Sequence, residues 1–355
     1  MSAMKSRYYV SKLDTLKQIF GTNAVEVQDA VLIVGTRSYP IIDDVVILLD
    51  PNHYPPPLKE HFQLGNHRSA CSPNFAEDIQ STFGKEWTSF PKILPEHREE
   101  FLRYFDLVNL SALSNLRVCD LGCGIGRWSY FLKDKCRELI LIDFSESIFV
   151  ARHNLRDVNN VMFFMADLKH LPFANNFADF LFCLGVLHHL PTNAIEEVAG
   201  LKKYAPALLI YLYYSLDNRP AYFRLLLSLV TVIRNRLSRI NSSWFRSIFS
   251  WCGALLLYRP LTLIGKFLEP LGISSHVPLY DGYKGKSIER IRQDVYDRFF
   301  TRIEQRFSKN EIIMELAEQF KAIQISERAP YWHFLCLREE SSILEKPDNF
   351  NRRMH

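Results

Sequence analysis

The chain has 355 residues, of which 48% are hydrophobic and 23% are charged, and its formal net charge is +4. This ordinary composition excludes a disordered chain, and the length fits one large domain or two unequal domains. The charge is too mild to require a nucleic-acid partner, because such a partner usually demands a concentrated basic face.

The seven cysteines are odd in number and lie mostly within apolar runs. This usage indicates reduced, buried thiols in a cytoplasmic protein and not a disulfide scaffold. The N-terminal residues show no signal-peptide pattern. We also expect no membrane-spanning helix, because the longest apolar stretches are interrupted by Arg234, Arg246, Arg259, Pro260 and Lys266.

A small α+β unit is expected over residues 1–57. Its pattern predicts a helix over 12–20, two strands over 30–35 and 44–50, and a turn containing Pro40 between the strands. Three consecutive prolines at 55–57 cannot continue a helix or a central strand, so they mark the end of the unit.

Residues 75–340 are interpreted as one α/β domain. After helical patterns over 75–110, short runs that are apolar on both faces alternate with further helical patterns. These runs lie at 116–122, 138–143, 160–167, 178–185 and 206–214. Runs of this kind, separated by helices, indicate a parallel sheet that helices cover on both faces.

The sheet is expected to end in an antiparallel strand. The last two apolar runs, 320–328 and 333–340, are separated by only a short turn, whereas parallel neighbours need a longer crossover. A long, mostly helical insertion at 217–285 interrupts the alternation before these runs. A polar tail follows at 341–355.

The segment VCDLGCGIGRWSYFL, residues 118–132, joins the first run to a helical pattern. A metal site is disfavoured, because Cys119 and Cys123 would need two further ligands at suitable spacing and none follows. A dinucleotide loop of the GxGxxG type is also disfavoured, because Arg127 stands where its third glycine is required.

The loop Asp120-Leu-Gly122-Cys-Gly124-Ile-Gly126 resembles the D/E-x-G-x-G-x-G motif of class I S-adenosylmethionine-dependent methyltransferases. This resemblance implies a Rossmann-like sheet and S-adenosylmethionine as the cofactor. The cofactor has no pyrophosphate, so the loop need not cradle a phosphate, and glycines let the backbone approach its methionine and ribose portions. Asp120 is then expected to bind the cofactor's ammonium group directly or through water.

The ends of the following strands extend the resemblance. Asp143, seventeen residues after Gly126, can accept hydrogen bonds from both ribose hydroxyls, and the resemblance implies an adenine amino contact at Asp167. FADFLFCLGVLHHLP resembles the motif that follows the fourth strand in this family. The expected cofactor-binding residues are Asp120, Gly122, Cys123, Gly124, Gly126, Asp143, Phe144, Asp167, Leu168 and Leu184.

The resemblance covers the chain from about Phe83 to Arg338, and bacterial members of this family are often encoded near glycan or natural-product pathways. The LHHLP segment is also similar to methyltransferases of quinone biosynthesis. Members of this broad group act on many acceptors, so the substrate half of the chain is less specific than its cofactor half.

The N-terminal unit has a resemblance of its own. RSYPIIDDVVILLD, residues 37–50, resembles the end of the small zinc-ribbon activator of tRNA and protein methyltransferases. That ribbon carries cysteine pairs, whereas the first cysteine of this chain is Cys71. We therefore expect a metal-free structural remnant in preference to a partner-docking unit.

Candidate catalytic residues follow from the rule that ligands bind beyond the carboxyl ends of parallel strands. His188 and His189 follow the fourth strand, and Tyr214 follows the fifth. Histidine titrates near neutrality and is the most natural base, although a base is needed only if the acceptor must lose a proton. The alternative is that one histidine packs against the neighbouring helix. Trp87, upstream, is expected to pack on the sheet.

The insertion combines apolar and basic residues. Between Arg219 and Glu269 there are eight basic residues and one acidic residue, among many Leu, Ile, Phe and Trp. Such a segment fits a helical lid that closes the substrate pocket, and it also fits peripheral contact with a membrane surface. The second interpretation would suit a lipid-linked acceptor.

We therefore interpret the chain as a class I S-adenosylmethionine-dependent methyltransferase that acts on a small-molecule or lipid-linked acceptor, with methylation of oxygen favoured. It would be cytoplasmic, or peripheral at the inner membrane surface. A tRNA, nucleic-acid or protein methyltransferase is an alternative, although Leu184-Gly-Val-Leu187 stands where many amino-methylating enzymes have an NPPY-like tetrad. A non-catalytic cofactor-binding scaffold is a second alternative.

Overall fold

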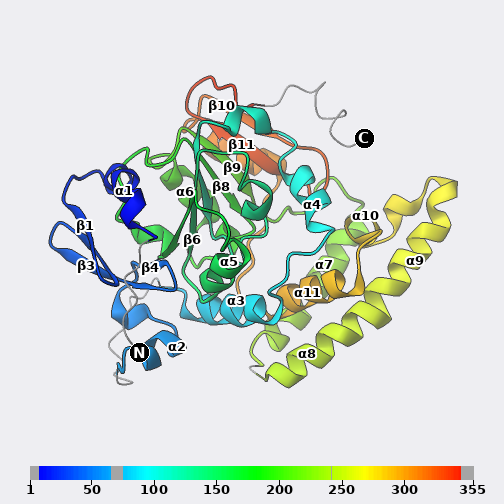
Figure 1. Ribbon diagram of the computed structural model, residues 1–355. Coiled ribbons are helices and arrows are strands. Elements are labelled where there is room, and N and C mark those ends of the chain that lie inside the picture. Colours follow the sequence, from blue (N-terminus) through cyan, green and yellow to red (C-terminus); the bar gives the residue numbers. More distant parts are fainter. Residues whose placement is uncertain (1–7, 65–74, 241, 345–355) are drawn as a thin grey trace.

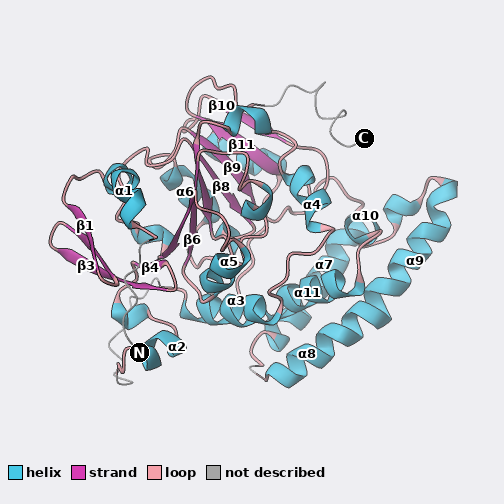
Figure 2. Cartoon of the chain, viewed as in Figure 1, coloured by secondary structure: helices cyan, strands magenta, loops and turns pink. Residues whose placement is uncertain are grey.

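The computed structural model describes residues 8–64, 75–240 and 242–344, and these form a mixed sheet with helices on both faces (Figures 1 and 2). The sheet has eleven strands within the described residues, in the order β1-β2-β3-β4-β7-β6-β5-β8-β9-β11-β10. The strands are β1 (Val25–Gln28), β2 (Val31–Val34), β3 (Arg37–Ile42), β4 (Val45–Ile47), β5 (Arg117–Leu121), β6 (Glu138–Asp143), β7 (Val161–Met165), β8 (Phe180–Leu184), β9 (Ala207–Tyr211), β10 (Ala322–Ile325) and β11 (His333–Leu337).

The central strands confirm the expected Rossmann-like arrangement. Strands β5 to β9 pair in parallel, β11 pairs antiparallel with β9, and β10 pairs antiparallel with β11. All residues of β5, β7, β8, β9 and β11 are buried, which explains why their sequences are apolar on both faces. The chain order reverses between β5 and β8, so the carboxyl ends of these strands form the topological switch point at which ligands bind in such sheets.

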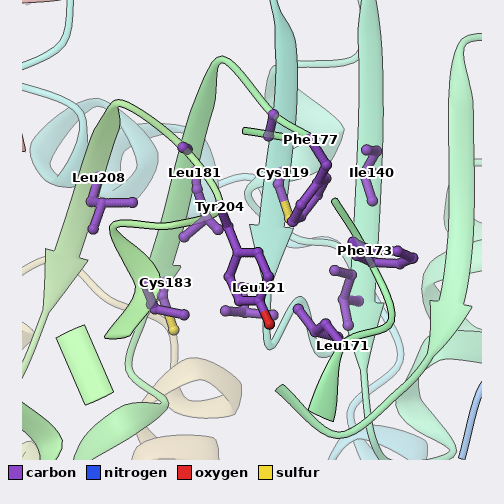
Figure 3. Close-up of a cluster of buried hydrophobic side chains, with 14 of the residues drawn as sticks. Cys119, Leu121, Ile140, Leu171, Phe173, Phe177, Leu181, Cys183, Tyr204 and Leu208 are labelled. Carbon is purple, nitrogen blue, oxygen red and sulfur yellow. The ribbon is translucent and has the colours of Figure 1, made fainter. Parts of the chain in front are cut away.

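Helices cover both faces of the sheet. The helices are α1 (Leu13–Phe20), α2 (Pro56–His61), α3 (Glu77–Ser89), α4 (His97–Tyr104), α5 (Ser147–Asn154), α6 (Ala194–Leu201), α7 (Ala221–Leu237), α8 (Ser243–Cys252), α9 (Arg259–Leu268), α10 (Tyr280–Tyr283), α11 (Ile288–Phe300) and α12 (Lys309–Leu316). Helices α1, α6 and α12 contribute to the core on one face, and α4 and α5 to the core on the other. Figure 3 shows the first core, where Cys119 packs near Phe177 and Leu121.

The N-terminal unit differs from the expected two strands. It forms four strands, and β4 pairs in parallel with β7, so the unit continues the central sheet (Figure 1, blue). The segment 37–42, expected as a turn, is strand β3. Pro40 is tolerated there because the short β4 pairs only with Ile41 and Ile42, so no neighbour on that side requires a donor from Pro40.

The insertion builds a helical layer beside the sheet (Figure 1, yellow-green to orange). Helices α8 and α9 are joined by the π-helical segment η7 (Gly253–Tyr258). Residues of α7, α8, η7 and α11 form a separate apolar core around Tyr258, Val295 and Phe300. The π-helical turn precedes Pro260 and accommodates a ring that would otherwise clash with the preceding turn.

The helix formed by α8, η7 and α9, called the rod below, differs from the expectation that no stretch could span a membrane. Within the described residues, one helix, Ser243–Leu271, is long and apolar enough by length and composition, with a mean hydropathy of 1.4. The continuous helix passes through Pro260, and an 18-residue apolar window can be placed in it despite the basic residues. Only 28% of that window is buried.

A buried tyrosine fastens the N-terminal unit to the central sheet. The Tyr9 hydroxyl lies 2.8 Å from the Asp44 carbonyl oxygen and accepts a hydrogen bond of 3.0 Å from the Phe163 N–H in β7. Tyr9 is fully buried, so water cannot replace these partners.

Replacing Tyr9 with Phe should therefore lower the free energy of unfolding by about 1–3 kcal/mol, because backbone groups of Asp44 and Phe163 lose a buried partner. Urea unfolding followed by circular dichroism measures the change. Tyr39→Phe is the matched control, since the Tyr39 hydroxyl has no hydrogen bond within the described part of the chain. Equal losses in both variants would contradict the assigned role of Tyr9.

Candidate functional site

The glycine loop after β5 lies at the switch point and is held close to the loop after β8. Gly122 and Gly124 have φ values of +77° and +53°, which residues with a side chain rarely adopt. A Cβ atom on Gly122 would lie 2.4 Å from the Val186 side chain, so this close approach of two loops requires glycine.

The Asp143 carboxylate, at the end of β6, fixes the glycine loop. Its Oδ2 accepts a hydrogen bond of 2.9 Å from the Gly124 N–H, and its Oδ1 accepts bonds from the Ser145 N–H at 2.9 Å and hydroxyl at 2.7 Å. Burial raises the pKa of Asp143, although these bonds favour the charged form and oppose the rise.

Asp120 lies beneath the loop. The Ser129 hydroxyl donates a 2.6 Å hydrogen bond to its carboxylate. Burial raises the pKa of Asp120 to about 7, the bond from Ser129 opposes this rise, and the neighbouring Asp143 carboxylate adds to it. A buried carboxylate that titrates near neutrality can receive a cation at modest cost.

Asp167 begins the turn after β7. One carboxylate oxygen accepts a 3.1 Å bond from the Lys169 N–H, and the other lies 3.0 Å from the His170 ring nitrogen. This turn aligns Asp167 and Leu168 along the wall of the pocket described next.

A narrow cavity of about 70 Å³ runs over the glycine loop. Eight of the ten residues expected to bind the cofactor line it: Gly122, Cys123, Gly124, Asp143, Phe144, Asp167, Leu168 and Leu184. Asp120 and Gly126 do not line it. The structure thus brings one set of residues together from four strand ends.

Trp87 of α3 covers the loop, which differs from the expectation that it packs on the sheet. A Cβ atom on Gly124 would lie 3.3 Å from the Trp87 indole, so the ring rests directly on the glycine backbone. The Arg127 guanidinium lies 4.8 Å from the Trp87 ring and 4.4 Å from the Trp128 ring. Arg127 therefore binds the covering helix to the loop.

A second cavity of about 590 Å³ adjoins the first. The two share a wall made of Phe83, Trp87, Arg127, Leu184 and Gly185. The helical insertion supplies much of the remaining wall through residues of α7, η7, α9 and α10, and α11, which follows the insertion, supplies more. That the insertion acts as a lid stays a prediction.

The aromatic residues after the strands lie on this second cavity. Tyr213, Tyr214 and Tyr331 line it, and the Tyr213 hydroxyl donates a 2.9 Å bond to the Asp297 carboxylate. Tyr214 thus lies on this cavity, just after the carboxyl end of β9, and its catalytic role stays a prediction.

The two histidines expected as bases are placed differently. His188 is fully buried and stacks on Tyr213 with ring centroids 3.9 Å apart, and burial holds its pKa well below the usual range. His189 is buried and its Nδ1 lies 2.7 Å from the Ile303 carbonyl oxygen. Neither lines either cavity. The rule correctly placed both histidines after the carboxyl end of β8. Their side chains, however, contact Tyr213 and the Ile303 carbonyl and not the cavities.

Glu86 is a functional candidate that sequence reasoning missed. It lines the larger cavity, its side chain is 1% exposed, and its Oε2 has no hydrogen-bond partner among the described residues. Burial and the nearby Asp297 carboxylate raise its pKa well above the usual range. The sequence does contain a sign of this burial. Glu86 lies on the same apolar face of the helix as Phe83 and Phe90, where an acidic residue is unusual.

The site was compared with known proteins. Residues 118–203 match a family model described as "Methyltransferase domain". This segment contains β5 to β8 and most of the first cavity's wall, including the glycine loop.

Two curated relatives are each similar to part of the chain. Phosphoethanolamine N-methyltransferase 3 of Arabidopsis thaliana is 30% identical over 107 residues, covering 29% of this chain and 21% of the relative. A tRNA U34 carboxymethyltransferase of Aliarcobacter butzleri is 33% identical over 96 residues, covering 26% of this chain and 30% of the relative. The chain thus spans about a fifth and a third of these proteins. A solved DhpI–SAH complex is 14% identical, covers 75% of this chain and 97% of its own, and has a TM-score of 0.43.

The raised pKa of Asp120 predicts a pH dependence of stability. Its folded pKa of about 7 exceeds its usual value of 3.8, so the folded state binds the proton more tightly. The resulting stability is present below pH 4 and is lost as the pH rises through 7. Relative to Asp120→Asn, the wild type should lose about 1 kcal/mol per pH unit across this window. Urea unfolding between pH 5 and 8 measures it, and Asp157→Asn, at an exposed site, should parallel the wild type.

The residues present fit the expected cofactor. The loop offers a close backbone approach, Asp143 and Asp167 offer acceptors for hydroxyl and amino groups, and Asp120 offers a buried anion for an ammonium group. This donor set agrees with the family match. Residues 118–203 thus match a methyltransferase-domain family and lie on a Rossmann-like sheet, and the cofactor that this match and the loop indicate is S-adenosylmethionine.

Proposed function

We propose that the protein transfers a methyl group from S-adenosylmethionine to an acceptor bound in the 590 Å³ cavity. The observation that carries this proposal is the wall that the two cavities share, made of Phe83, Trp87, Arg127, Leu184 and Gly185. A donor on one side of such a wall and an acceptor on the other can be aligned at short range, and alignment supplies much of the rate of a displacement reaction.

Within the first cavity, Asp143 and Asp167 would hold the ribose and adenine portions. Asp120, which is buried and does not line the cavity, would attract the ammonium group through water. Drug-sized ligands usually occupy about 300–1,000 Å³. The 70 Å³ of this cavity is smaller, so entry of the cofactor requires Trp87 and α3 to move away from Gly124. Helix α3 would therefore act as the cover of the cofactor site.

The acceptor that we propose is a small or lipid-linked molecule. The second cavity is a concave site lined by residues of the sheet edge and of the helical insertion, which suits a compact group better than a folded nucleic acid. Its wall carries Tyr214 and Tyr331 beside the apolar Leu227 and Val230, so it offers hydrogen bonds next to an apolar surface. The named relatives act on different acceptors, phosphoethanolamine and tRNA, and so do not choose between them.

Methylation of an oxygen is favoured by Glu86. When bound, S-adenosylmethionine supplies a sulfonium methyl group whose transfer leaves a neutral thioether. Glu86 precedes the shared-wall residue Trp87, and its unpartnered carboxylate on the second cavity can take the proton of an acceptor hydroxyl as the oxygen–carbon bond forms. Its raised pKa makes it a stronger base than an exposed carboxylate, at the cost of a smaller ionised fraction at neutral pH.

Calorimetry with S-adenosylmethionine and S-adenosylhomocysteine tests the cofactor site. Asp143→Ala should lower the affinity by about tenfold or more, because the loop loses its anchor and the ligand an acceptor. Asp157→Ala, at a surface site that is 91% exposed, should bind as the wild type does. If the wild type binds neither ligand, or if Asp143→Ala binds equally well, the proposed function is wrong.

The base can be tested once labelled-methyl transfer into fractionated cell extract has provided an acceptor. Glu86→Gln should lower kcat by about a hundredfold or more with unchanged cofactor affinity, and the wild-type rate should rise with pH as Glu86 ionises. Glu77→Gln, at an exposed site of the same helix, is the control and should keep the wild-type rate. A Glu86→Gln variant with the wild-type rate and pH profile would exclude this role.

A further inference from the structure

Large apolar side chains are exposed on the outer face of the helical layer. Among the described residues, 21 such side chains are exposed, and seventeen of them lie between 222 and 273. The most exposed of the seventeen include Phe267 at 79%, Leu256 at 76% and Trp244 at 72%. The surface of a soluble monomeric protein rarely has so many exposed apolar side chains in one region, so this concentration indicates a contact surface.

The exposed residues follow helical periodicity. On α7 they are spaced by three and four residues, at Tyr222, Leu225, Leu226, Leu229, Val232 and Ile233. On the α8–α9 rod they are Trp244, Ile248, Trp251, Leu255, Leu256, Leu257, Leu263, Ile264 and Phe267. Each helix thus has an exposed apolar stripe in addition to its packed face, which contacts α11 in α7, α8 and η7 and contacts α10 in α9.

The charges beside these stripes select one kind of partner. The exposed ionisable side chains between 221 and 273 are Arg224, Arg236, Arg239, Arg259, Lys266 and Glu269. The one acidic residue among them, Glu269, is paired with Lys284. An isologous contact with a second copy would place these basic residues near one another, whereas an anionic surface would complement them.

The rod is held against the protein too closely to leave it easily. A Cβ atom on Gly265 would lie 2.1 Å from the Tyr280 ring, and one on Gly253 would lie 2.7 Å from Val295. Beneath the layer, Arg234 of α7 forms a buried ion pair with Glu304. Insertion of the rod across a bilayer would break the first two contacts, so its geometry suits a position parallel to a surface.

We infer that the outer face of α7, α8, η7 and α9 docks onto a membrane that contains anionic lipids. The apolar stripes enter the interface, and the basic residues meet the headgroups. Leu226 and Leu257 are 42% and 47% exposed on this face and also line the 590 Å³ cavity, so the docked surface continues into that cavity. If the proposed function holds, an acceptor with an alkyl chain can reach the site from the bilayer.

Flotation of the purified full-length protein with phosphatidylcholine vesicles, with and without phosphatidylglycerol, tests this inference. The wild type should bind the anionic vesicles, and salt should weaken the binding. A Leu256→Glu, Phe267→Glu variant should bind about tenfold or more weakly, because two exposed apolar anchors are lost. An Arg236→Glu, Arg239→Glu variant should lose the preference for phosphatidylglycerol.

Met314→Glu is the matched control, because Met314 is 77% exposed on α12, which packs on α6 and β10 of the sheet. It should float as the wild type does. Failure of the wild type to bind either vesicle, or an equal loss in Met314→Glu, overturns the inference. A dimer in light scattering that the Leu256→Glu, Phe267→Glu variant abolishes, without vesicle binding, assigns the face to a second copy instead. Calorimetry with S-adenosylmethionine in the absence of vesicles separates failure of the proposed function from failure of docking.

Discussion

The hydrogen bond from the Gly124 N–H to the Asp143 carboxylate is the contact on which the site depends. It ties the loop after β5 to the end of β6, while the lack of a side chain at Gly122 lets the loop after β8 approach the same point. Three neighbouring strand ends are thereby fixed relative to one another without a metal or a disulfide among the described residues. The shape of both cavities follows, because Trp87 of α3 rests on this loop and α11 packs against α3.

The central sheet could be predicted because its strands are buried on both faces, so their sequences carry little ambiguity. The N-terminal strands could not be predicted as well. The apolar runs at 30–35 and 44–50 predicted β2 and β4, but β1 and β3 were missed, because β1 alternates Val with Glu and Gln, and β3 begins with exposed residues and contains Pro40. Pro40 and the nearby aspartates favour turns locally, and the pairing of β3 with β2 and β4 overrides this preference.

The candidate site likewise has features that the sequence predicts and features that it does not. Backbone features such as the glycine loop and the ends of β6 and β7 have spacing that sequence alone reveals. The sequence alone does not reveal the direction of a side chain. His188, for example, stacks on Tyr213, which is distant from it in the sequence. Glu86 was overlooked for the opposite reason: its helical spacing placed it on a buried face, but no motif accompanies it. Local sequence patterns predict which strand ends lie together. The surroundings of each side chain depend on α3 and on the helical insertion, whose sequences carry no recognised motif.

Helix α3 has a consequence for the order of events. It contributes Phe83 and Trp87 to both cavities, and it contacts α5 on the sheet as well as α11 of the helical layer. A ligand that displaces this helix on one side therefore changes the space and the free energy of binding on the other. Under the proposed function, thermodynamic linkage would make that influence mutual, so that donor and acceptor would alter each other's affinity by the same factor. The single helix between them turns two adjacent binding equilibria into one coupled system.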